Sequence, residues 1–359
     1  MARLNQRTPA ALGYRMPAEW EPHEATWIAW PHERSDWPGK FAPVPWIYCD
    51  IVRHLARLEK VRILIASEEA ERQASRMLEK SGADLDAVEF LRFETDRSWC
   101  RDYCPIFVKN RAGDVAITDW HFNGWAKYEN WTRDDKAPAA IAKKLGMPLF
   151  RPVSNGRRVV LEGGSIDVNG AGLLLTTEEC LLSEVQSRNP GTGRAGMERI
   201  LADHLGIHKV LWLKNGIAGD DTHGHVDDIA RFVNPTTVVA ASEDNREDTN
   251  YANLRENLEL LRGMKDEEGC PLKIVKLPMP APVWFDGQRL PASYANFYIA
   301  NGIVLVPVFN DPNDRIALNT LARLFPDREV TGIYSRDLVL GLGTLHCLTQ
   351  QQPAAGALS

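Results

Sequence analysis

The chain lacks any apolar stretch close to the roughly 18 residues that a membrane helix needs. Its first residues, MARLNQRTPAALGYRMP, also lack the continuous apolar segment of a secretory signal. We therefore expect a cytoplasmic protein without a membrane partner.

Runs of basic residues are missing as well. The 359 residues carry a mild formal net charge of −6, and their lysines and arginines are dispersed. Proteins that hold nucleic-acid phosphates or anionic lipids gather positive charge on one face. The sequence therefore argues against nucleic acid as a partner.

Dense cysteine spacing, the mark of a small disulfide scaffold, is also absent. The six cysteines are Cys49, Cys100, Cys104, Cys180, Cys270 and Cys347. Cys100 and Cys104 have the spacing of half a zinc site, but no second cysteine pair or nearby histidine completes it. We expect six reduced thiols.

No linker, low-complexity tract or charge block marks a domain boundary. We predict one catalytic domain over residues 1–359, with a frayed tail after about residue 353. Composition is that of a globular protein, with 44% hydrophobic and 25% charged residues.

Apolar runs typical of strands alternate with helical patterns. Strands are predicted over 25–31, 61–67, 87–93, 115–122, 209–215, 236–242, 272–278, 302–309 and 329–335, and helices over 46–60, 68–80, 195–207 and 250–264. Residues 106–120 and 165–177 read as hairpins, because each has a turn signal between two apolar runs. The chain is therefore predicted to be α/β, with mixed sheets.

The segment GDDTHGHVDDIARFV (219–233) gathers two histidines and four aspartates ahead of a strand. In one interpretation, His223, His225 and Asp227 bind a metal, since alternate residues of an extended segment point the same way. In a second interpretation, no metal is bound, His225 acts as an acid/base and Asp227 holds the substrate through its negative charge. In a third interpretation, the segment is only a solvated polar loop.

Other candidate residues lie in shorter stretches. Arg101 and Asp102 lie between aromatic residues in SWCRDYCPIFV, where a surface ion pair is the simplest interpretation. In VVLEGGSIDV, Glu162 precedes paired glycines, which permit a bulge or a close ligand approach. Nine of the eleven tryptophans fall within the first 131 residues, and one or two could form the wall of a cation pocket.

The stretch GLGTLHCLTQQQP surrounds Cys347 with glycines, a histidine and glutamines. A structural cysteine would suit an apolar run. Glycine before a cysteine instead lets a bound group approach the sulfur. Cys347 is therefore either packing or a nucleophile.

Eight segments follow one another along the chain: MPAEWEPHEATWIAWPHERSDWPG, WCRDYCP, LEGGSID, TTEECLL, HGHVDD, LPASYANFYIANG, FNDPND and GTLHCLTQQQP. Together they resemble the agmatine deiminases, relatives of the peptidylarginine deiminases. The resemblance runs from about Met16 to Pro353. It implies a five-bladed α/β propeller, the pentein fold with pseudo-fivefold symmetry, whose site lies on the central axis.

The resemblance also implies roles for individual residues. Cys347 corresponds to the nucleophile, and His225, Asp227, Asp102 and Glu162 to the family's other polar site residues. His223 and His346 match supporting positions. Trp99 and Gly163 are expected to contact substrate beside Glu162. Some positions depart from the family pattern, namely Tyr103, Cys104, Leu342 and Thr344.

The implied reaction is hydrolysis of a small cationic guanidino substrate, agmatine first, to N-carbamoylputrescine and ammonia, a step toward putrescine and other polyamines. Asp102 and Asp227 would hold the guanidinium against Cys347, and His225 would transfer protons. No cofactor or metal is needed, and we expect a homo-oligomer. The alternatives are deimination of arginine, a guanidino acid or peptidylarginine, a metal-dependent hydrolase, and a silent guanidine-binding protein.

Overall fold

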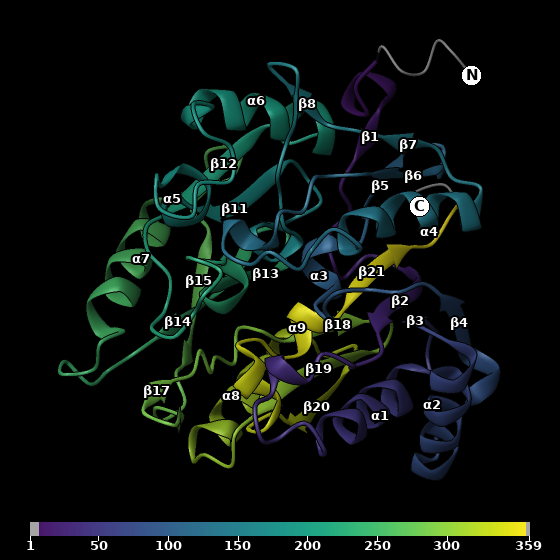
Figure 1. The fold of residues 1–359 in the computed structure, drawn as a ribbon. Coiled ribbons are helices and arrows are strands. Elements are labelled where there is room, and N and C mark those ends of the chain that lie inside the picture. The colour runs from purple at the N-terminus through teal and green to yellow at the C-terminus, as the bar shows by residue number, and fades with distance from the viewer. Residues whose placement is uncertain (1–6, 357–359) are drawn as a thin grey trace.

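The computed structural model describes residues 7–356, and it places most strands in five sheets that share one pattern (Figure 1). In spatial order, the sheets contain β1 (Tyr14–Arg15), β5 (Ile106–Asn110), β6 (Val115–Thr118) and β7 (Leu149–Phe150); β10 (Asp167–Val168), β11 (Leu173–Thr177) and β12 (Lys209–Leu213); β13 (Ala230–Asn234), β14 (Thr237–Ser242) and β15 (Lys273–Pro278); β18 (Tyr298–Ala300), β19 (Ile303–Val308) and β20 (Glu329–Tyr334); and β21 (Gln350–Pro353), β2 (His23–Ala29), β3 (Lys60–Ile65) and β4 (Val88–Arg92). Two small hairpins pair β8 (Val153–Ser154) with β9 (Arg157–Arg158), and β16 (Trp284–Phe285) with β17 (Gln288–Arg289).

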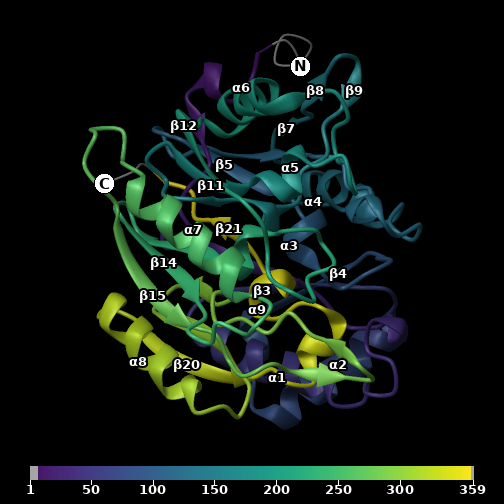
Figure 2. The same cartoon turned by 90° about the vertical axis from the view of Figure 1, so that its left-hand side faces the viewer.

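Each of the five sheets combines an antiparallel pair with a parallel pair. The pairs β5–β6, β10–β11, β13–β14, β18–β19 and β21–β2 are antiparallel, and the next strand in each sheet joins in parallel. Parallel neighbours need a crossover connection, and helices supply it here. The same ββαβ pattern thus recurs in the five sheets, which Figure 2 shows from another side.

The helices are α1 (Val44–Leu55), α2 (Glu68–Ser81), α3 (Cys100–Tyr103), α4 (Ala137–Leu145), α5 (Glu178–Leu182), α6 (Gly193–Leu205), α7 (Tyr251–Gly263), α8 (Asn313–Leu324) and α9 (Leu345–Leu348). The longer helices cover the outside of these sheets, whereas the short helices α3 and α9 lie in the interior (Figures 1 and 2). None of the helices in residues 7–356 is long and apolar enough to cross a membrane.

Local sequence signals explain where α2 starts and stops. Ser67 caps the helix, because its Oγ accepts a hydrogen bond from the backbone N–H of Ala70 at 3.2 Å. Gly82 ends it with a φ of 78°, a left-handed conformation that favours glycine. The helix predicted over 68–80 is thus confirmed, as are the other three predicted helices and the nine predicted strands, although the helix predicted over 46–60 ends five residues early, at Leu55, and the strand predicted over 115–122 ends four residues early, at Thr118.

The last strand pairs with the first long strand and so brings the two ends of the sequence together. Thr26 and Trp27 of β2 lie opposite Gln351 and Gln350 of β21. Trp27 Nε1 donates to Gln352 Oε1 at 3.0 Å. The glutamines after Cys347 are therefore buried structural groups that fix the segment carrying the cysteine. In the tail predicted to fray after residue 353, the backbone N–H of Ala354 donates to Pro22 O at 2.8 Å and that of Gly356 to Gly113 O at 3.2 Å. Residues 357–359 lie outside the described residues.

Candidate active site

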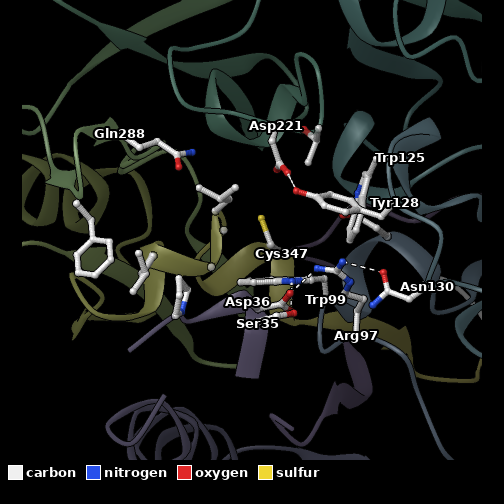
Figure 3. Close-up of a pocket in the computed structure, with 18 of the residues that line it drawn as sticks. Ser35, Asp36, Arg97, Trp99, Trp125, Tyr128, Asn130, Asp221, Gln288 and Cys347 are labelled. Atoms are coloured by element: carbon white, nitrogen blue, oxygen red, sulfur yellow. Dashed lines mark hydrogen bonds and ion pairs between the residues drawn. The ribbon is translucent and has the colours of Figure 1, made fainter. Parts of the chain in front are cut away.

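A cavity of about 1000 Å³ has Cys347 in its wall (Figure 3). Its acidic lining residues are Asp36, Asp102, Asp221 and Asp286, and its aromatic ones are Trp99, Trp125, Tyr128 and Phe285. Arg97 also lines it, but its guanidinium is bonded to Asp36 and Asn130. Carboxylates and aromatic faces both attract positive charge. The cavity therefore suits a small cation.

Cys347 lies in α9, and its sulfur is enclosed by polar groups. Asn296 Nδ2 lies 3.1 Å from Sγ, and Asp227 Oδ2 lies 3.7 Å from it. Burial, and then the carboxylates of Asp227, Asp228 and Asp102, raise the pKa of the thiol well above its ordinary value. The resting thiol is therefore neutral, and a cation bound among these carboxylates would favour the thiolate.

Asp102 lies in α3, with both carboxylate oxygens bonded and buried. Oδ1 accepts from the backbone N–H of Gly164 at 3.0 Å, and Oδ2 accepts from Trp125 Nε1 at 2.9 Å. Burial raises its pKa to about 6; His225 opposes the rise, whereas Asp227 and Glu162 add to it. The surface ion pair considered for Arg101 and Asp102 is wrong, since both are buried and Asp102 faces the cavity.

His225 lies between two carboxylates just before the short helical turn Val226–Asp228. Its Nδ1 is 3.8 Å from Asp102 Oδ1, and its Nε2 is 4.0 Å from Glu162 Oε2. Burial opposes the charged ring, but Asp102, Cys180 and Asp227 outweigh it and raise the pKa of His225 well above its ordinary value. These neighbouring charges therefore favour the protonated ring.

Asp227 has one occupied and one open oxygen. Its Oδ2 lies 2.7 Å from His346 Nδ1, and the other nitrogen of His346 lies 2.8 Å from Glu19 Oε2. Despite burial, the contacts with His346, then His225 and Arg231, lower the pKa of Asp227. Its Oδ1 is buried and has no hydrogen-bond partner among the described residues. The carboxylate is thus ionised and able to accept a further donor.

Gly164 marks the point where three of these side chains converge. A methyl group on its Cα would lie 2.6 Å from His225 Nδ1, 2.9 Å from Asp102 Oδ1 and 3.1 Å from Asp227 Oδ2. Gly163, expected to contact substrate, instead faces the backbone oxygen of Arg101, 2.3 Å from where such a methyl would lie. The paired glycines are therefore needed for close packing, and Gly164 is the one beside the acid/base groups.

Two other sequence predictions have mixed outcomes. Trp99 lines the cavity, as expected, and its Nε1 donates to Asp36 Oδ2 at 3.1 Å. Glu162, expected to bind substrate, is not in the cavity lining, and neither are His225 and Asp227. Oε1 of Glu162 accepts from Arg188 Nε at 3.0 Å, and its other oxygen faces His225. Glu162 therefore lies against the histidine, and its contact with substrate stays a prediction.

The metal set proposed for the HGHVDD segment is not assembled. His223 has a φ of 67°, and its ring turns to Ser183 Oγ at 3.2 Å and Glu179 Oε1 at 3.7 Å, away from Asp227. Within residues 7–356, the group with metal-ligand spacing is instead Glu162, Cys180 and His225. Arg188, which is bonded to Glu162, places a positive charge against that group and makes it a poor cation site.

Sequence reasoning missed several residues of the site. Asn296, which contacts the Cys347 sulfur, lies in LPASYANFYIANG, a segment noted as a motif without a role for its asparagine. Trp125 and Asp221 belong to groups that the sequence pointed out, the early tryptophans and the aspartates of residues 219–233, but neither was named as a site residue. They reach the cavity because distant loops fold together, which no local spacing predicts.

The model of the Porphyromonas-type peptidyl-arginine deiminase family matches residues 15–353. The chain belongs to this family. An agmatine deiminase of Pseudomonas aeruginosa (strain LESB58) is 38% identical to it, and 97% of each chain is covered. The structure of an agmatine deiminase of Enterococcus faecalis aligns with a TM-score of 0.89 at 32% identity, covering 97% of this chain and 98% of that one. A C. jejuni agmatine deiminase carrying a cysteine-to-serine change, with substrate bound, aligns with a TM-score of 0.85 at 28% identity, covering 95% and 97%.

Residues that depart from the agmatine deiminase pattern lie around the site. Leu342 lines the cavity with a φ of 68°, a conformation that favours glycine. Thr344 is buried and donates its hydroxyl to Asn296 Oδ1 at 2.7 Å. Tyr103 and Cys104 are buried and absent from the cavity lining. Of these four residues, Leu342 lines the cavity, and Thr344 is connected to the Cys347 sulfur through Asn296.

Proposed function

We propose that this protein hydrolyses agmatine to N-carbamoylputrescine and ammonia, with Cys347 as the nucleophile. One observation carries the proposal: Asp102, Asp227 and His225 converge on Gly164 beside the Cys347 sulfur. Agmatine deiminases among the relatives support the substrate.

Binding begins with the two carboxylates. Guanidinium N–H groups match carboxylate oxygens in paired geometry. Asp227 offers its open Oδ1, and each oxygen of Asp102 keeps a second lone pair. Held between them, the guanidinium carbon faces the sulfur, which lies 3.7 Å from Asp227 Oδ2. The positive charge also offsets the carboxylates and so lowers the cost of forming the thiolate.

Covalent chemistry then proceeds in two halves. As the cation binds, Cys347 loses its proton to solvent. The thiolate then adds to the guanidinium carbon, the C–N bond breaks, and the departing nitrogen takes a proton from His225 to leave as ammonia. A covalent thiouronium remains on the sulfur. His225, now neutral, removes a proton from water, which adds to the same carbon. As the C–S bond breaks, the added oxygen gives up its remaining proton to solvent, the ureido product leaves and the thiolate is restored. One water is consumed, and one ammonia and one proton are released, which together make an ammonium ion.

The outer part of the cavity favours a cationic substrate tail. Asp221 lies on its wall, beside the hydroxyl of Tyr128 and 3.3 Å from Lys127 Nζ, and Asp286 adds a further carboxylate (Figure 3). The positive charge of Arg97 is already paired with Asp36, and its guanidinium also donates to Asn130. Agmatine ends in an ammonium group, whereas arginine and guanidino acids carry a carboxylate. The charge of the lining therefore supports agmatine.

We infer that the five sheets form the five blades of a pentein-type propeller. The repeated ββαβ unit and the pairing of β21 with β2, which joins the chain ends in one sheet, support this arrangement. A homo-oligomeric assembly, a cytoplasmic location and a cofactor-free reaction stay predictions.

A substrate panel tests the proposal. Ammonia release should be fastest with agmatine, compared with arginine, guanidinobutyrate and an arginyl peptide, and the product should be N-carbamoylputrescine by mass spectrometry. EDTA should leave the rate unchanged. A larger kcat/KM for arginine or guanidinobutyrate than for agmatine would contradict the assignment of agmatine as the substrate, but it would leave the cysteine-dependent hydrolysis of a guanidino group standing. No ammonia from any guanidino compound would instead favour a silent binding protein.

Gly343→Ala should lower agmatine turnover by roughly 10- to 100-fold, because displacing a nucleophile by about 1 Å has effects of this order. The added methyl would lie 3.2 Å from Cys347 Sγ and 2.8 Å from Trp99 Cζ3, so one of them must move. Steady-state kinetics and a thermal melt measure the result. Gly263→Ala is the matched control, since nothing lies within 4 Å of that position. Unchanged kcat in Gly343→Ala would mean that position 343 does not constrain the sulfur.

A further inference from the structure

Left-handed backbone conformations gather on one wall of the cavity. Trp125, Ala126 and Gln186 have φ values of 57°, 52° and 46°, a region that residues other than glycine rarely adopt. Such strained residues persist only where surrounding contacts hold them, and they collect at active sites and ligand clamps. Trp125 lines the cavity beside Tyr128 (Figure 3). The contacts that hold this strained wall are therefore candidates for a role in substrate binding.

Gln186 connects two separate loops of this wall through its side-chain amide. Its Nε2 lies 3.1 Å from the backbone oxygen of Trp125 and 3.1 Å from that of Asp221. Both partners are acceptors, so nitrogen must face them, and each takes one of the two amide hydrogens. Gln186 is held in turn by Arg188, whose Nη1 donates to its backbone oxygen at 3.0 Å. One side chain thus joins two loops that are far apart in the sequence.

Each of the two loops carries a polar group of the site. Trp125 Nε1 donates to Asp102 Oδ2 at 2.9 Å, and it so orients the carboxylate proposed to bind the guanidinium. Asp221, the carboxylate proposed to favour the ammonium tail, accepts from the hydroxyl of Tyr128. Gln186 therefore joins the wall at the guanidinium end of the substrate to the wall at its ammonium end. Both N–H groups of the amide are used on backbone oxygens, so Gln186 acts through these loops.

We propose that Gln186 is a positioning residue of this deiminase: its amide fixes the Trp125 and Asp221 loops to each other and so sets the spacing between Asp102 and Asp221. This inference rests on the proposed function, because it assigns the two carboxylates to the two ends of agmatine. A guanidinium and an ammonium joined by one aliphatic chain reach both carboxylates only when their spacing matches the chain. Loops that are fixed before binding also avoid the entropy cost of ordering them around the substrate.

Gln186→Gly is the most direct test, because it removes the amide and also relieves the left-handed backbone. A residue that only packs would give wild-type kinetics here, with an equal or higher melting temperature. We expect kcat/KM for agmatine to fall roughly 5- to 150-fold, the range for two neutral hydrogen bonds, with most of the loss in KM. Gln186→Met keeps the length of the side chain without its donors, and it should behave alike if the glycine variant does not fold.

The pH dependence gives a readout that loss of stability alone would not move. Burial raises the pKa of Asp102 to about 6, and the hydrogen bond from Trp125 opposes that rise. When the Trp125 loop is released, the pKa of Asp102 should rise further, and the acidic decline in kcat/KM should move to higher pH. Trp125→Phe, which removes the indole N–H itself, should move the decline in the same direction. The other titratable groups that face Asp102 are unchanged in these variants: His225, Asp227, Glu162 and Cys347.

Asn155→Ala is the matched control. Asn155 also has a left-handed backbone, with a φ of 50°, but it lies in the turn between β8 and β9 and outside the cavity lining. Alanine tolerates this conformation less well than asparagine does. The melting temperature should therefore fall, while kcat/KM and its pH dependence should stay at wild-type values.

The outcomes separate the two proposals. Wild-type kcat/KM and an unmoved decline in folded Gln186→Gly and Gln186→Met would overturn the inference and leave Gln186 a packing residue. A lower melting temperature with an unmoved decline would do the same. If the wild-type protein releases no ammonia from agmatine, the proposed function fails, and amide hydrogen exchange still tests the connection. Exchange at residues 124–128 should be faster in Gln186→Gly than in the wild type, and equal rates would show that Gln186 does not hold this loop.

Discussion

Cys347→Ser is expected to lose agmatine hydrolysis by on the order of 10⁴-fold or more while keeping its fold. Serine matches cysteine closely in size, but its hydroxyl ionises far less readily than a thiol. His225 cannot act as its general base, because neighbouring carboxylates keep the ring protonated. The variant should therefore bind agmatine and fail to react.

The covalent intermediate gives a more direct measurement. Rapid acid quenching of the wild-type enzyme during turnover, followed by mass spectrometry, should find added mass on the peptide containing Cys347 and on no other cysteine. Cys49→Ser is the matched control: Cys49 is also buried, but it lies in the core on α1 and outside the cavity lining. It should change stability and leave turnover intact.

An adduct on Cys100 or Cys104 would show that the nucleophile is misplaced. Both lie in or next to α3 beside Asp102, and burial raises the pKa of Cys104 well above its ordinary value. Activity retained in Cys347→Ser would also show that Cys347 is not the nucleophile. The glycines around Cys347 would then serve only for packing against Trp37 and Trp99.

Much of the local structure could be predicted because it depends on neighbouring residues. Strong apolar periodicity located β3 and α2, and the turn signals at 111–114 and 169–172 correctly gave two antiparallel hairpins. Periodicity does not say how sheets are arranged, however. The pairing of β2 with β21, more than 300 residues apart, depends on buried contacts such as Trp27 with Gln352.

The site could be predicted where a residue carries its own chemistry. His225, Asp227 and Cys347 were singled out from their sequence settings, with alternatives left open, whereas Asp102 was placed in the site only by the resemblance to the agmatine deiminases. The structure brings the four together. Asn296 does not titrate, and its importance depends on a contact with a residue 51 positions away. The sequence likewise does not distinguish Gly163 from Gly164, since only the backbone path shows which one faces His225.

Lowering the pH should weaken catalysis through Asp102. Its pKa is raised to about 6, so the carboxylate is charged above that pH and neutral below it. A neutral carboxyl cannot pair with a guanidinium, and kcat/KM for agmatine should therefore fall as the pH drops through about 6. Bound guanidinium favours the ionised form, so the decline in kcat itself should lie at lower pH.

Asp102→Asn should lower kcat/KM by roughly 30- to 5,000-fold, the cost of truncating one partner of a buried charge pair. It should also abolish the decline near pH 6, because no proton is left to bind there. Asp36 is the sharp control: its pKa is also raised to about 6, mainly by burial, and it lines the same cavity. The decline should persist in Asp36→Asn, since Asp36 is bonded to Arg97 and Trp99 and does not converge on Gly164. If the fall in kcat/KM near pH 6 disappears in Asp36→Asn but remains in Asp102→Asn, Asp102 is not the carboxylate that binds the guanidinium. If the fall remains in both variants, a third group titrates near pH 6.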